Sequence, residues 1–118
     1  MTNSDNKTPS SVHDLRSALE LLKTLPGEYV ETNTEVDPHA ELSGVYRYVG
    51  AGGTCQRPTR KNGPVMVFNK IKGFENISVA IGLNGSRQRV SHFLQCEPAK
   101  LGHLLKDSVE NAIAPVMT

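Results

Sequence analysis

The apolar run "VMVF" that opens the stretch "VMVFNKI" (residues 65–71) constrains the fold of this chain more than any other feature. Side chains of a strand alternate between its two faces, so a strand that is apolar at every position has to be covered on both. We therefore expect residues 65–71 to form a central strand between two layers. The Ile- and Val-rich segment 76–83 and the alternating "EYVETN" (28–33) predict two shorter strands.

Two helices are predicted ahead of that strand. The first follows an N-cap expected at Ser11, and the dipeptide Pro26-Gly27 predicts its end. The second begins at Asp37-Pro38, because Asp caps free N–H groups and Pro loses nothing at the first helical position. Gly50 stands where a left-handed residue would end it. The two buried stripes are expected to hold Leu15, Ala18, Leu19 and Leu22, and Leu42, Val45, Tyr46 and Val49.

Two further helices are predicted after the strands. Ser86 is expected to be an N-cap rather than part of a hairpin turn, because the apolar residues that follow it have helical spacing. Glu97-Pro98 predicts the start of the last helix, and Pro115 would stop it. Its buried face is expected to consist of Leu101, Leu104, Leu105, Ser108, Val109 and Ala112.

The resulting order, α-β-α-β-β-α-α, predicts an α/β (α+β) fold in which helices pack on one small mixed sheet. Residues 1–10 are polar and have no apolar anchor after Met1, so we expect a disordered tail followed by one folded domain over 11–118.

Charge and apolar content restrict the function classes. The chain has 13 basic and 12 acidic residues and a net charge of +1, so no overall field draws it to nucleic acid or to an anionic membrane. No apolar run approaches the ~20 residues of a membrane span. The polar N-terminus lacks the apolar segment of a secretion signal, and Cys55 and Cys96 are isolated thiols, so we expect a cytoplasmic protein.

The stretch "GAGGTCQRPTRKNGP" (50–64) combines four glycines with three cations, Arg57, Arg60 and Lys61. A dinucleotide-binding loop needs its glycines between a strand and a helix, and a P-loop needs Gly-Lys followed by Ser or Thr. Here the glycines follow a predicted helix and precede a strand. We therefore expect an ordered surface loop, whose cations are either solvated or face an anion or a partner.

A second cationic pair, Arg87 and Arg89, falls in the first turn of a predicted helix, where the helix dipole disfavours positive charge. Either the pair is simply exposed, or it compensates a carboxylate, a phosphate or a partner surface. No histidine or cysteine lies at metal-ligand spacing, and no GxSxG motif is present. We therefore expect no metal site in this chain.

Several segments, in order, resemble one family. They are "DLRSALELL", "EVDPHAEL", "GAGGT" with "RPTR", "FNKIKG", "SRQR" and "APV", and they span about residues 12–116. This pattern is similar to the N-terminal domain of the UbiD-type decarboxylases, and most of all to the branch that acts on protocatechuate, gallate and 4-hydroxybenzoate.

The resemblance implies a specific chemistry for the full-length enzymes. They would use prenylated FMN with a divalent metal (Mn or Mg) and K+ in a reversible, non-oxidative decarboxylation, with the flavin as electron sink. A flavin prenyltransferase would supply that cofactor, and the enzyme would form homo-oligomers. The family's catalytic, cofactor-binding and metal-binding residues lie in a middle domain that would follow this chain, so none is carried over to it.

Two hypotheses follow. In the first, the chain is an N-terminal domain or fragment that packs on the cofactor domain and is inactive alone, with Arg57, Arg60, Arg87 and Arg89 facing the active-site cleft or the docking surface. In the second, it is a free-standing small α/β module that binds an anion or a protein.

Overall fold

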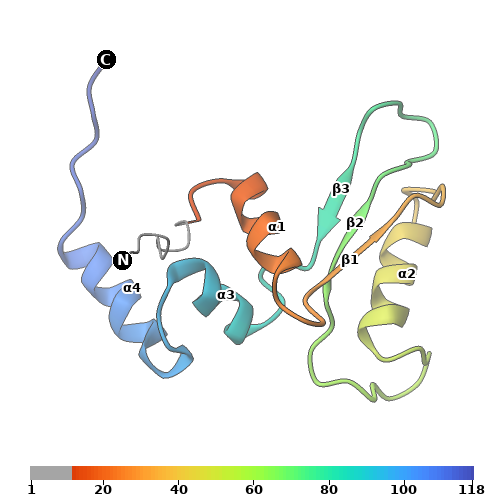
Figure 1. Cartoon of the computed structure of the whole chain (residues 1–118), viewed down its shortest axis with the longest axis horizontal. Helices are drawn as coiled ribbons and strands as arrows, with labels where there is room; N and C mark the ends of the chain where they lie inside the picture. Colours follow the sequence, from red (N-terminus) through yellow and green to blue (C-terminus); the bar gives the residue numbers. More distant parts are fainter. Residues whose placement is uncertain (1–11) are drawn as a thin grey trace, which may run out of the picture.

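The computed structural model describes residues 12–118 and confirms the predicted order of helices and strands (Figure 1). Ser11 and the predicted tail of residues 1–10 lie outside the described part. The elements are α1 (Leu15–Lys23), β1 (Tyr29–Thr32), α2 (Glu41–Gly50), β2 (Val65–Phe68), β3 (Val79–Ile81), α3 (Arg87–Leu94), the 3-10 helix η2 (Pro98–Lys100) and α4 (Leu101–Glu110).

The sheet has the order β1-β2-β3, with β2 in the centre as the sequence predicts. β1 runs parallel to β2, with Tyr29 opposite Val65, and β3 runs antiparallel to it, with Met66 opposite Ile81. All four residues of β2 are buried. The sheet is therefore mixed, and its first residues in β1 and β2 lie at the same end as the last residue of β3.

Each face of β2 has its own apolar core, as the alternation of a strand requires. Met66 and Phe68 pack with Leu42 of α2 on one face, and Val65 and Val67 pack with Leu22 of α1 on the other. Figure 1 shows α1 and α2 on opposite sides of the sheet. In the described residues, no helix is long and apolar enough to cross a membrane.

The first helix begins and ends inside its predicted bounds. Asp14, not Ser11, is the N-cap: its carboxylate accepts a hydrogen bond from the backbone N–H of Ser17 at 2.8 Å, and the Ser17 side chain closes a reciprocal capping box. The helix ends at Lys23 with Thr24 as its C-cap, ahead of Pro26. The predicted stripe is confirmed at Ala18 and Leu22, which are buried, but it is wrong at Leu15, which is 52% exposed.

The second helix begins at Glu41, so the predicted start at Pro38 is wrong. The Asp37 carboxylate accepts from the N–H of His39 at 2.8 Å and so forms a local turn instead of a helix cap. Ala40 then has a φ of 70°, which breaks the helical path before Glu41. At the other end Gly50 is still helical, and Gly52 and Gly53 are the residues with positive φ.

The last helix also differs from its prediction. Only Leu101 of α4 is buried, whereas Leu105 is 51% exposed and Val109 is 80% exposed. Figure 1 shows α4 at the far end of the molecule from α2, beyond α3. The amphipathic pattern of α4 is real, but the described residues leave most of its apolar side in solvent.

This difference predicts unequal costs for two leucine truncations. Leu22→Ala should lower the free energy of unfolding by ~2–5 kcal/mol, because Leu22 is fully buried between α1 and β2. Leu105→Ala on α4 is the matched control and should change it by less than about 0.5 kcal/mol. Urea unfolding of the 118-residue chain measures both, and equal losses would contradict the burial described here.

Candidate functional site

The glycine-rich stretch is a loop fastened to the end of α2. The backbone N–H and the hydroxyl of Thr59 both donate to the carbonyl of Ala51, at 2.8 and 3.1 Å. Gly52 has a φ of 91°, and a Cβ there would collide with the Thr59 side chain. Only glycine fits such a position, so the loop is shaped rather than loosely connected.

The two ends of this loop also touch. A Cβ on Gly63 would lie 2.5 Å from the Cα of Gly50, so the two backbones approach as closely as only glycine allows. Residues 51–62 thus leave α2 and return to its last residue before β2 begins. This geometry agrees with the predicted ordered surface loop.

Arg89 of α3 binds the end of the sheet at which the glycine-rich loop closes. Its side chain is 1% exposed. Its Nε donates to the Glu28 carboxylate at 2.9 Å, its Nη1 donates to the Gly82 carbonyl at 2.5 Å, and its Nη2 donates to the Gly63 carbonyl. Those partners lie just before β1, just after β3 and just before β2. The guanidinium therefore joins α3 to all three strands.

This network answers one question that the sequence left open. A cation in the first turn of α3 is compensated by a carboxylate, and that carboxylate is Glu28. The predicted N-cap Ser86 is confirmed: its hydroxyl accepts from the Arg89 N–H at 3.3 Å. Arg87, the other member of the predicted pair, is exposed. The structure thus separates two arginines that the sequence could only group.

Three cations meet at a hollow beside the loop. Arg47 from the last turn of α2 and Arg60 and Lys61 from the loop line a cavity of about 330 Å³. The other lining residues are Tyr46, Gly50, Ala51, Pro58 and Gly63, so no carboxylate lines it. Arg57, predicted to act with Arg60, is exposed and does not line this hollow.

Arg47 is the residue of this group that the sequence interpretation missed. The available signal was its place in the last turn of the helix that runs directly into a basic loop. Helical residues one turn from a helix end lie beside the chain that leaves it, so a cation there adds to the charge of the loop.

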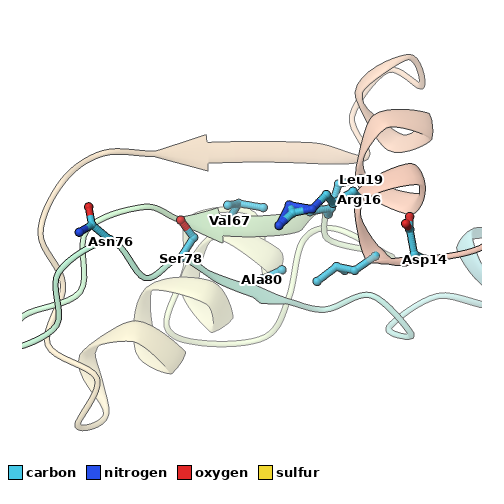
Figure 2. Close-up of a pocket in the computed structure, with 8 residues that line it drawn as sticks. Asp14, Arg16, Leu19, Val67, Asn76, Ser78 and Ala80 are labelled. Atoms are coloured by element: carbon cyan, nitrogen blue, oxygen red, sulfur yellow. The ribbon is translucent and has the colours of Figure 1, made fainter.

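A second hollow, of about 520 Å³, lies under the start of α1 (Figure 2). Leu19, Val67 and Ala80 give it apolar walls, and Figure 2 shows Arg16 extending from α1 toward the strands. The carboxylate of Asp14, at its rim, is engaged as the helix cap, and the hydrogen bonds from Ser17 lower the pKa of Asp14. The hollow therefore has no acid–base pair of its own.

A polar cluster crosses the sheet on the same face. Tyr29 Oη and Asn69 Nδ2 donate to the two oxygens of Glu31 at 2.7 and 2.6 Å, and Ser78 Oγ donates to Asn69 Oδ1 at 2.9 Å. The bond from Tyr29, and then that from Asn69, lowers the pKa of Glu31. Burial, and then the bond to Glu31, raises the pKa of Tyr29. Glu31 is thus held ionised, which makes it a weak proton acceptor at neutral pH.

Within residues 12–118, no three His, Cys, Asp or Glu side chains gather in a way that would hold a metal ion. The described residues thus offer a structural arginine, an uncompensated cationic hollow and a partly apolar hollow.

The Arg89 network predicts a sharp difference between the two arginines of α3. Arg89→Ala should cost ~3–5 kcal/mol of unfolding free energy, because Glu28 and two carbonyls lose their buried partner. Arg87→Ala should cost less than about 0.5 kcal/mol, since Arg87 is exposed. Denaturant unfolding of both variants is the measurement. Similar midpoints for the two would show that Arg89 does not hold the fold.

Comparison with known proteins places this geometry in a family. The family model of the 3-octaprenyl-4-hydroxybenzoate carboxy-lyase N-terminal domain matches residues 19–109. A gallate decarboxylase from Lactiplantibacillus plantarum is 52% identical over 102 residues, which are 86% of this chain and 21% of that protein.

Two solved structures have the same fold. The apo 3,4-dihydroxybenzoic acid decarboxylase of Klebsiella pneumoniae has a TM-score of 0.78 and 47% identity, over 89% of this chain and 21% of that one. The apo enzyme of the same kind from Enterobacter cloacae has a TM-score of 0.79 and 48% identity, over 92% of this chain and 22% of that one.

The chain spans about a fifth of the length of the gallate decarboxylase and of both solved structures. Its matched part covers the loop, the sheet and α3, where the Arg89 network lies. The chain belongs to the UbiD family, as the N-terminal domain of the 3-octaprenyl-4-hydroxybenzoate carboxy-lyase type.

Proposed function

We propose that this chain serves as the N-terminal domain of a prenylated-FMN-dependent, reversible, non-oxidative decarboxylase of hydroxybenzoates of the protocatechuate and gallate kind. The observation that carries the proposal is the match of nearly the whole chain to a gallate decarboxylase and to 3,4-dihydroxybenzoic acid decarboxylases that are about five times as long. In this role the chain packs on the cofactor domain and does not catalyse the reaction alone.

The cofactor and its metal would be held outside this domain. A divalent ion such as Mn or Mg is bound through several oxygen ligands, and residues 12–118 contain no cluster of acidic, His or Cys side chains that fits one. The described residues therefore offer no site for the divalent metal, and we assign no step of the chemistry to them.

The exposed apolar side of α4 supports a docking role. Leu105 and Val109 face solvent on one side of the helix, and Ile113, Val116 and Met117 beyond it are each at least 86% exposed. Contiguous exposed apolar surface marks an interaction site. We place the contact with the cofactor domain on α4 and the segment that follows it.

The arginines take different parts in this proposal. Arg57, Arg60 and Arg87 are exposed and stay candidates for the cleft or for docking. Arg89 uses three of its nitrogens inside the domain, where it holds the strand ends in place. A free-standing anion-binding module is the second candidate function, and the cationic hollow at Arg47, Arg60 and Lys61 is the observation that favours it.

Activity measurements test the first proposal. The 118-residue chain, produced alongside a flavin prenyltransferase, should show no flavin absorbance and should not release CO2 from gallate or 3,4-dihydroxybenzoate. The gallate decarboxylase relative, with its own matching fifth replaced by this chain, should decarboxylate one of these acids. Turnover by the pure chain, or an inactive but folded and flavin-loaded chimera, would contradict the assignment.

The docking surface has a separate test. Val109→Asp should weaken the binding of this chain to the relative's remaining domains by at least about tenfold, because it places a charge in an apolar contact. His103→Asp adds the same charge about 120° around α4 from Val109 and is the matched control. Calorimetric titration gives both affinities. Equal affinities of the two variants would show that the contact does not lie on this side of α4.

A further inference from the structure

We propose that Arg47, Arg60 and Lys61 form a binding site for a small oxyanion, a carboxylate or a phosphate. The proposal concerns the cationic hollow, which these three residues line together with Tyr46 and the backbone of Gly50, Ala51 and Gly63. It does not depend on whether the chain works within a longer enzyme.

The three cations of this hollow have no counter-charge beside them. Four other cations of the described chain, Lys23, Lys72, Arg89 and Lys106, each have a carboxylate oxygen within 4 Å. Among residues 12–118, Arg47, Arg60 and Lys61 have no such partner, and neither do five exposed cations elsewhere, Arg16, Arg57, Lys70, Arg87 and Lys100. Arg47, Arg60 and Lys61, however, line one hollow together, and no acidic residue lines it. Like charges gathered around one cavity repel each other, and an anion between them relieves that repulsion.

The loop also fixes the backbone on either side of Arg60 and Lys61. Thr59, next to Arg60, is fixed by two hydrogen bonds to Ala51. Gly63, two residues after Lys61, is fixed by Arg89 Nη2 and by its close approach to Gly50. The backbone of the loop has already lost its conformational entropy on folding. Ligand binding therefore does not have to order it, which favours affinity.

The end of α2 does not explain the cluster. Arg47 alone lies in the last turn, where the helix dipole favours a cation. The carbonyls of Arg47, Tyr48 and Val49 already accept hydrogen bonds from the N–H groups of Ala51, Gly53 and Gly52. The helix end is therefore satisfied by backbone, and Arg60 and Lys61 need another reason to converge there.

The chemistry of the lining defines the ligand class. A guanidinium presents a planar fork that matches two oxygens of a carboxylate or phosphate, and a lysine adds a point charge. Tyr46 also lines the cavity. A cavity of about 330 Å³ lies at the small end of ligand sites, so the site suits a compact oxyanion or an aromatic acid.

Backbone amide NMR of the 118-residue chain tests the site, with inorganic phosphate, acetate and 3,4-dihydroxybenzoate as probes at constant ionic strength. We expect saturable shifts at residues 47, 60, 61 and 63. Replacing Arg60 and Lys61 together by Gln should weaken binding at least about tenfold, since it removes two charge-assisted contacts. The control, Arg57→Gln with Arg87→Gln, removes two exposed cations elsewhere and should leave the affinity unchanged.

The relative affinities of the three probes identify the ligand class. Tighter binding of 3,4-dihydroxybenzoate than of acetate identifies the site as one for aromatic acids, and tighter binding of phosphate identifies a phosphate site. Both support the proposal. Shifts that grow linearly without saturation, or an equal loss of affinity in the control variant, would overturn it. Amide spectra of the free variants establish that each one is folded.

Discussion

The buried fork of Arg89 is the interaction on which the arrangement of this domain depends. One guanidinium bonds Glu28, Gly63 and Gly82, and so meets the chain where it enters β1, where it enters β2 and where it leaves β3. Burying a charge without a partner is costly, and the carboxylate together with two carbonyls offsets that cost. α3 thereby fixes the end of the sheet at which the glycine-rich loop also closes.

The layers of the fold could be predicted from the sequence, because local patterns determine them. A strand without a polar face, "VMVF", requires cover on both sides, and α1 and α2 provide it. Ser86 is recognisable as a cap because the apolar residues after it have helical spacing. Both features rest on residues that are neighbours in the chain, where propensity and periodicity act.

Other features needed the three-dimensional structure. Glu28 and Arg89 are 61 residues apart, and no local pattern links them. α2 starts later than predicted because the Asp37 carboxylate accepts a hydrogen bond from the N–H of His39 in a local turn. Such a turn competes with helix capping for the same side chain. At the candidate site, the sequence pointed to Arg60 but not to Arg47, since their meeting depends on the path of the loop. The helical pattern of α4 was correct, yet periodicity cannot say whether the cover for its apolar side lies within the same domain.

We propose that this domain, whose sheet has its own cores, presents α4 to the rest of a decarboxylase. Hydrogen exchange of the amides, measured for the chain alone and for the same chain fused to the remaining domains of the gallate decarboxylase relative, tests it most directly. Amides of β2 and α3 should be protected in both, while those of Leu101–Glu110 should gain protection only in the fusion. Unchanged exchange along α4, with protection gained elsewhere on the domain, would contradict the account.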